Sequence, residues 1–148
     1  MTTFALDSSA LIAWVLQENG RWRGIDRVLT SPGVDPVLPG PALTEVITVL
    51  HRRGNTSSSA QIVATLRAIG VRVEHAIDVD LIRAAELLEV SIAYPAPKRG
   101  DGSTPTLSLA DSIILAITER LRLKILTRDR YWVEFANDGH TTADVLKL

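Results

Sequence analysis

The sequence contains no cysteine, so disulfides, thiolate zinc sites and cysteine nucleophiles are excluded. Its longest apolar runs, such as residues 113–117, are far shorter than the roughly 20 residues needed to span a bilayer. Met1 leads directly into a strand-like segment, without the basic region that opens a secretory signal. We therefore expect no membrane association and a cytoplasmic protein, and the absence of cysteine suits a reducing compartment.

An excess of charge and several familiar catalytic motifs are also missing. The formal net charge of -1 argues against the broad basic face of a nucleic-acid coat protein, so any contact with nucleic acid must be local. No G-x-x-x-x-G-K loop is present to bind a nucleoside triphosphate. The absence of G-x-S-x-G, together with scattered histidines, argues against a Ser-His-Asp hydrolase.

What remains is an apolar chain in which strands and helices alternate. Its 148 residues are 46% hydrophobic, which fits one domain, residues 1–148, that buries roughly two thirds of its unfolded surface. Apolar strands are expected at residues 3–7, around 37–38, at 71–76 and at 123–129. Helices are expected at residues 8–17, 23–29, 41–53, 58–69, from a cap at Asp78 to about 92, and from 107 onward. This alternation predicts an α/β fold with a parallel sheet covered on both faces.

Acidic residues recur at equivalent places in this pattern. Asp7 ends the first strand and Asp129 the last, while Asp111 lies in the first turn of the helix that leads into the last strand. Glu45 sits in the first turns of its own helix, beside an apolar face. Because ligands gather outside the carboxyl ends of parallel strands, we expect these four side chains to share one edge of the sheet.

Four carboxylates at one poorly solvated edge would repel one another unless a cation lay among them. Oxygen ligands without sulfur or clustered histidine favour Mg²⁺ or Mn²⁺, which retain several waters and take only one or two carboxylates directly. A hydrated, open site of this kind suits the hydrolysis of phosphodiesters.

Each acid also has a purely structural interpretation. Asp111 follows Ser108 by three residues, which is the spacing of a capping box. Asp7 and Asp129 can cap the helix or turn that follows each of them, and Glu45 can pair with the arginines that end its helix. Taken singly, these interpretations are favoured. Independent caps, however, give no reason for acids to recur at the same edge.

Four short segments follow one another along the chain: "FALDSSALIAWV", "ALTEV", "LSLADSIILAIT" and "ILTRDRYW". In this order they resemble PIN-domain ribonucleases, and more narrowly the VapC-type toxins of bacterial type II toxin–antitoxin systems. The resemblance covers essentially the whole chain. It implies a PIN-like three-layer α/β/α sandwich with a central parallel sheet, metal-dependent endonucleolytic cleavage of RNA, a homodimer, and a cognate antitoxin protein that covers the active-site groove.

Carried over by residue, the resemblance implies a catalytic quartet of Asp7, Glu45, Asp111 and Asp129. Within it, the implied ligands of Mg²⁺ (or Mn²⁺) are Asp7, Asp111 and Asp129. Hydroxyl positions that the family uses near the metal or its waters fall on Ser8, Ser9 and Thr127. Ordinary capping and turn hydrogen bonds explain these hydroxyls equally well.

Two features leave alternatives open. The connection from Tyr94 to Thr106 is longer than the resemblance leads us to expect, and Arg128 and Arg130, which flank the last acid, fit either RNA phosphates or solvent. A phosphoacceptor signalling domain is the main competing interpretation, but it would require paired acids after the first strand and a lysine closing a late one. A PIN fold that only binds partners is a third.

Overall fold

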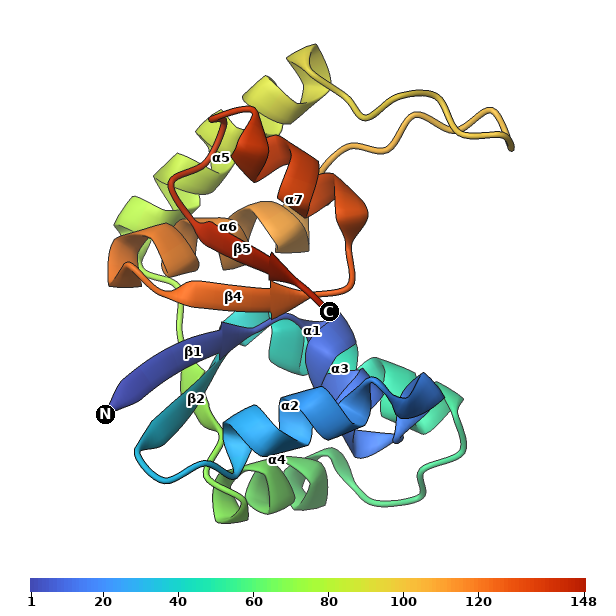
Figure 1. Cartoon of the computed structure of the whole chain (residues 1–148), viewed down its shortest axis with the longest axis vertical. Helices are drawn as coiled ribbons and strands as arrows, with labels where there is room; N and C mark the ends of the chain where they lie inside the picture. The colour runs from blue at the N-terminus through green and yellow to red at the C-terminus, as the bar shows by residue number, and fades with distance from the viewer.

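The computed structural model describes residues 1–148, in which five strands form a single parallel sheet (Figure 1). The strands are β1 (Thr2–Leu6), β2 (Val34–Pro39), β3 (Arg72–Glu74), β4 (Lys124–Thr127) and β5 (Asp144–Lys147). The helices are α1 (Ser8–Val15), α2 (Trp22–Leu29), α3 (Gly40–Arg52), α4 (Ser59–Ala68), α5 (Asp78–Ala93), α6 (Leu109–Leu121) and α7 (Arg130–Asn137), with a short 3-10 turn at Glu18–Gly20. The predicted α/β class and central parallel sheet are confirmed.

The strand order is β3-β2-β1-β4-β5. The chain first adds β2 and β3 on one side of β1, and then crosses back to add β4 and β5 on the other side. Because parallel crossovers are right-handed, this reversal puts helices on both faces of the sheet. β1 and β4, the neighbours at the reversal, run in register from Phe4 opposite Lys124 to Leu6 opposite Leu126. Their carboxyl ends therefore lie side by side, where ligands bind in open α/β sheets.

The core surrounds these central strands. One cluster of 25 buried residues includes Leu6 and Leu126 at the strand ends and Trp132 and Phe135 from α7. Asp7, the first residue beyond β1, is consequently poorly solvated. No helix combines the length and the apolar character that crossing a bilayer requires.

Several elements differ from the prediction. β2 spans six residues rather than a short run around Val37, and α7 and β5 were not predicted as elements. The N-cap of α5 is Ile77, so this helix begins one residue earlier than a cap at Asp78 predicts. The Asp80 carboxylate accepts a hydrogen bond from the Ile77 backbone N–H at 2.9 Å and so stabilises this helix start.

Candidate active site

Asp7 is the most buried of the predicted acids, with only 5% of its surface exposed. It follows β1 directly and caps α1, because its carboxylate accepts a hydrogen bond from the Ser8 backbone N–H at 2.8 Å. The hydroxyls of Ser9 and Thr127 both donate to Asp7 Oδ2, at 2.8 and 2.9 Å. The side chain is thus held from its own helix and from the end of β4.

Glu45 joins this group through Ser8. The Ser8 hydroxyl donates to Glu45 Oε2 at 2.5 Å, which ties the first turns of α3 to the Asp7 turn. The structural interpretation in which Glu45 pairs with the arginines at the end of α3 is not seen, since Glu45 forms no ion pair. Arg53 instead pairs with Glu18 at 2.7 Å.

The turn after β4 is connected to the same network by backbone groups. Ser9 Oγ accepts a hydrogen bond from the Arg128 backbone N–H at 3.0 Å, and Thr127 Oγ1 accepts one from the Asp129 backbone N–H at 3.0 Å. Each hydroxyl therefore donates to Asp7 and accepts from the β4–α7 turn. The three predicted hydroxyl residues all contact the acids, and two of them connect the neighbouring strand ends.

Asp111 and Asp129 each cap a helix as well. Asp111 forms the expected capping box with Ser108, whose backbone N–H donates to Asp111 Oδ2 at 3.1 Å. Asp129 accepts from the Tyr131 backbone N–H at 2.8 Å at the start of α7. Capping fixes the positions of these carboxylates, so the structural interpretation of each acid and the shared site are compatible.

The charges of these acids act on one another. Burial raises the pKa of the Asp7 carboxyl, and the charge of Glu45 adds to this, although hydrogen bonds from Ser9, Thr127 and Ser8 oppose it. Burial likewise raises the pKa of Asp111, reinforced by the charges of Asp7 and Asp129 and opposed by the hydrogen bonds to Ser108. These mutual effects are evidence that the predicted acids share one electrostatic environment.

No basic side chain neutralises the four acids, since none of them forms an ion pair. The nearest arginines in sequence are engaged elsewhere. Arg128 pairs with Glu18 at 2.6 Å and Arg130 with Glu134 at 2.8 Å. The site therefore carries uncompensated negative charge.

The donor set fits a hard divalent cation in its chemistry, because it consists of carboxylate and hydroxyl oxygens. No three carboxylate or imidazole side chains are arranged to coordinate a single ion together. A cation that keeps most of its waters and contacts only one or two carboxylates directly is compatible with this spacing. The remaining acids would then act through water.

The sequence patterns missed two residues beside this site. Glu18 holds the Arg128 side chain, and Arg21 lines a hollow that includes Ser9 and Asp129. Both lie in the irregular segment between α1 and α2, where no periodicity marks a side chain as inward or outward. Only the folded chain brings them to this edge.

Comparison with known proteins places this geometry in a family. Residues 4–138 match the model of the PIN domain. No curated protein matches the sequence significantly. The fold is similar to that of VapC20 from Mycobacterium tuberculosis, described as a sarcin-ricin loop cleaving toxin, with a TM-score of 0.64 and 21% identity over 92% of this chain and 95% of the other.

Two further structures are similar in fold. VapBC-1 from nontypeable Haemophilus influenzae has a TM-score of 0.69 and 15% identity, over 99% of this chain and 98% of the other. A toxin–antitoxin complex from Klebsiella pneumoniae has a TM-score of 0.65 and 16% identity, over 97% and 95%.

Proposed function

The chain belongs to the PIN domain family, and from this premise we propose that it is a metal-dependent endoribonuclease and the toxin of a toxin–antitoxin pair. The observation that carries the proposal is the hydrogen-bonded group that joins Glu45, Asp7 and the backbone of Asp129 at the carboxyl ends of β1 and β4, with Asp111 close enough that the charges of Asp7 and Asp129 raise its pKa. Hydrogen bonds and mutual charge effects connect these acids, and no basic side chain balances them.

We propose that Asp7, Asp111 and Asp129 hold Mg²⁺ or Mn²⁺, with one or two of these carboxylates in direct contact with the ion and the rest acting through its waters. When bound, such an ion neutralises charge on the phosphodiester and makes an attacking water more acidic. Hydroxyls from Ser9 and Thr127 hold the Asp7 carboxylate in one orientation. Such preorganisation reduces the rearrangement that the site needs during the reaction.

A cognate antitoxin and a homodimer belong to the same proposal. The neighbours from H. influenzae and K. pneumoniae are a VapBC protein and a toxin–antitoxin complex, which supports an antitoxin as partner. For the homodimer, the support is the exposed apolar side chains of Val79, Ile82 and Ile92 on α5. Analytical ultracentrifugation measures the mass of the protein in solution. A mass of 16.1 kDa, that of one chain, at every protein concentration would contradict the homodimer.

Cleavage of total bacterial RNA tests the nuclease proposal. With Mn²⁺ or Mg²⁺ the wild type should produce discrete RNA fragments, and a chelator should stop the reaction. Asp7→Asn should reduce cleavage by at least about 10²-fold, because it removes charge where the cation is held. Asp138→Asn is the matched control, because Asp138 is an exposed residue at the end of α7 and its side chain lies outside the site.

Melting curves provide the second measurement on the same proteins. Mn²⁺ should raise the melting temperature of the wild type and of Asp138→Asn, because a ligand of the folded state stabilises it. Asp7→Asn should fold and should show a smaller shift. A wild type that cleaves no RNA and melts at the same temperature in Mn²⁺ would instead identify a PIN fold that only binds partners.

A further inference from the structure

A hollow of about 490 Å³ opens beside the acids and has no apolar residue in its lining. It is lined by Ser9, Arg21, Arg99, Arg128, Asp129 and Arg130. The four arginines come from three separate parts of the chain: the start of α2, the Tyr94–Thr106 connection and the β4–α7 turn. In a protein with a net charge of -1, this is a local concentration of positive charge directly next to the proposed cleavage site.

The arginines of the hollow are only partly neutralised. Arg21 and Arg99 are exposed and neither forms an ion pair. Arg128 pairs with Glu18, but that carboxylate is shared with Arg53. At least two guanidinium groups are therefore free to bind an anion.

The backbone of Arg99 is held by the internal structure of its connection. The Ala96 backbone N–H donates to the Pro105 carbonyl at 2.9 Å, and the Arg99 backbone N–H donates to the Ser103 carbonyl at 2.8 Å, so the two arms are paired. Gly102 closes the turn with a φ of +86°, which favours glycine. Figure 1 shows that the connection extends from the body on the side toward which the strands point.

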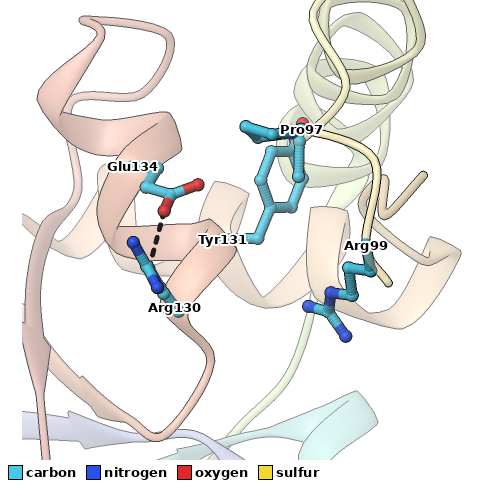
Figure 2. A pocket seen from close by; sticks show the side chains of 6 residues that line it. Pro97, Arg99, Arg130, Tyr131 and Glu134 are labelled. Carbon is cyan, nitrogen blue, oxygen red and sulfur yellow. Dashed lines mark hydrogen bonds and ion pairs between the residues drawn. The ribbon is translucent and has the colours of Figure 1, made fainter. Parts of the chain in front are cut away.

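The charged surface continues along α7. A second hollow, lined by Ala96, Pro97, Arg99, Arg130, Tyr131 and Glu134, shares two arginines with the first. Figure 2 shows Arg130 and Arg99 on opposite sides of the Tyr131 ring, with Pro97 above the ring. The Tyr131 hydroxyl donates to the Tyr94 carbonyl at 3.0 Å, which fixes the base of the connection to α7.

We propose that Arg21, Arg99, Arg128 and Arg130 form a phosphate-binding surface for single-stranded RNA, and that Arg21 and Arg99 contribute most to its affinity. This proposal rests on the proposed nuclease function, and it names the residues that hold the substrate. Guanidinium groups bind phosphate through paired N–H donors, and phosphate contacts position a strand without reading its bases. A hollow without apolar lining does not resemble the core of a protein–protein interface.

Such a surface also solves an electrostatic problem of the site. Four carboxylates repel the backbone of RNA, and arginines beside Asp129 offset that repulsion where the strand enters. Positively charged grooves that follow the backbone are the usual means of binding single strands. The overall charge of the protein can remain near zero because only this edge has to meet phosphates.

Binding of a fluorescently labelled 12-nucleotide RNA of randomised sequence tests this proposal by fluorescence anisotropy in Mn²⁺. The parent protein is Asp7→Asn, which prevents cleavage. Adding Arg21→Gln and Arg99→Gln together should weaken binding by roughly tenfold or more. The slope of log affinity against log salt concentration should become shallower by roughly 0.7 for each phosphate that the variant no longer neutralises.

The matched control adds Arg27→Gln and Arg52→Gln to the same parent. These exposed arginines form no ion pair and do not line either hollow. Because each pair of substitutions removes two positive charges, the two variants have the same net charge. The control should keep the parent's affinity and salt slope. Equal weakening by both pairs would overturn the assignment, because total charge rather than this surface would then govern binding.

The two proposals fail in different ways. Wild-type cleavage of RNA together with unchanged affinity of the Arg21/Arg99 variant would overturn the surface and leave the nuclease standing. Absence of wild-type cleavage, with the expected loss of RNA affinity in the variant, would overturn the nuclease and support RNA binding. A parent that binds no RNA at all would overturn the surface and favour a protein partner for it.

Discussion

At the scale of single residues, Thr127 has the most constrained position in the site. It is fully buried, donates to Asp7 and accepts from the Asp129 backbone N–H. Together with Ser9, this hydroxyl connects the acid that follows β1 to the turn that follows β4. We assign Thr127 a positioning role rather than a direct contact with substrate.

Replacing Thr127 with valine tests this role. Valine keeps the shape but removes the hydroxyl, so the Asp129 backbone N–H loses its partner and Asp7 Oδ2 keeps only the hydrogen bond from Ser9. We expect a decrease of about 1–3 kcal/mol in the free energy of unfolding. We also expect a weaker Mn²⁺-induced shift in melting temperature, which a purely structural role would not change.

Thr127→Ser is the control for that variant, because serine retains the hydroxyl. It should restore the metal-induced shift and most of the cleavage, at the cost of one methyl group in the core. Full activity of Thr127→Val would show that the hydroxyl does not position Asp7.

Residue identities were the most predictable part of the site. The four acids were predicted from where they fall along strands and helices, because parallel strands end at a common edge, and the hydroxyl residues were implied by the resemblance to PIN-domain ribonucleases. Arg21 was not assigned to the site, and for Arg99 the sequence left RNA phosphates and solvent as equal alternatives, since both residues lie in irregular segments where a pattern gives no direction. Whether the acids bind metal together remains a prediction.

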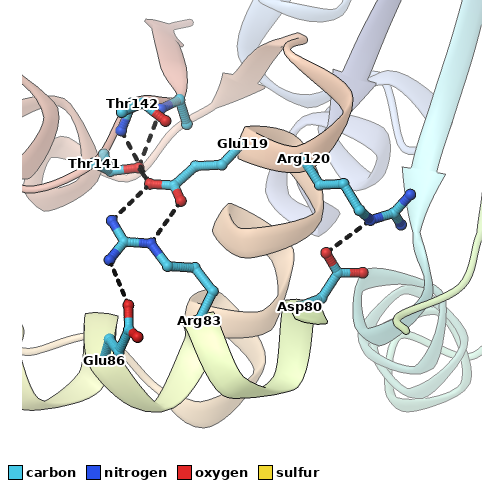
Figure 3. A network of polar contacts seen from close by, with 8 residues as sticks. Asp80, Arg83, Glu86, Glu119, Arg120, Thr141 and Thr142 are labelled. Atoms are coloured by element: carbon cyan, nitrogen blue, oxygen red, sulfur yellow. Dashed lines mark hydrogen bonds and ion pairs between the residues drawn. The ribbon is translucent and has the colours of Figure 1, made fainter. Parts of the chain in front are cut away.

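At the scale of elements, α5 and α6 are joined by charged groups around Glu119 (Figure 3). Glu119 accepts from Arg83 Nε of α5 at 2.8 Å, and from the Thr141 hydroxyl and the Thr142 backbone N–H that precede β5. Arg120 of α6 pairs with the buried Asp80 of α5 at 2.8 Å. These interactions hold the helix that presents Asp111.

The acidity of Glu119 gives this junction a pH dependence. Burial alone raises the pKa of Glu119, but hydrogen bonds from Arg83, Thr141 and Thr142 and the charge of Arg83 outweigh burial, so the pKa is lowered from 4.5. A lowered carboxyl pKa contributes stability above the unfolded value and loses it as the pH falls through the folded value. The loss begins below about pH 4.5.

Glu119→Gln should therefore unfold more easily at neutral pH, by about 1–3 kcal/mol, and the difference from wild type should shrink as the pH falls below about 4.5. Urea unfolding at a series of pH values measures this. Glu86→Gln is the matched control, because Glu86 also pairs with Arg83 but is 58% exposed. An equal, pH-independent loss of stability in both variants would contradict the assignment.

Short helices and strands are the elements that the sequence patterns predicted least well. α7 was expected only as a turn, because its eight residues place Tyr131, Trp132 and Phe135 at helical spacing for barely two turns. β5 has four residues and no alternation long enough to recognise. β2 contains Pro36 and Pro39, which suggested a loop, yet both fit within the strand. Long periodic segments such as α3 were predicted nearly in full.

At the scale of the whole molecule, we propose that residues 1–148 unfold as one domain. The buried cluster of 25 residues joins segments from Ala5 to Ala143 in one core. Far-UV circular dichroism and tryptophan fluorescence should therefore report a single coincident transition. Trp14 and Trp132 make the fluorescence sensitive to the N-terminal and C-terminal halves of the chain. Separate transitions would show that the chain contains two units that unfold independently.

The Tyr94–Thr106 connection has one further consequence. Its arms bond to each other, and it meets the rest of the protein mainly at its base through Tyr94 and Tyr131. A segment so self-contained can be exchanged or shortened without disturbing the carboxylates. Under the proposed function, a change in the length or charge of this connection would alter how tightly RNA phosphates are held while leaving the proposed catalytic acids in place.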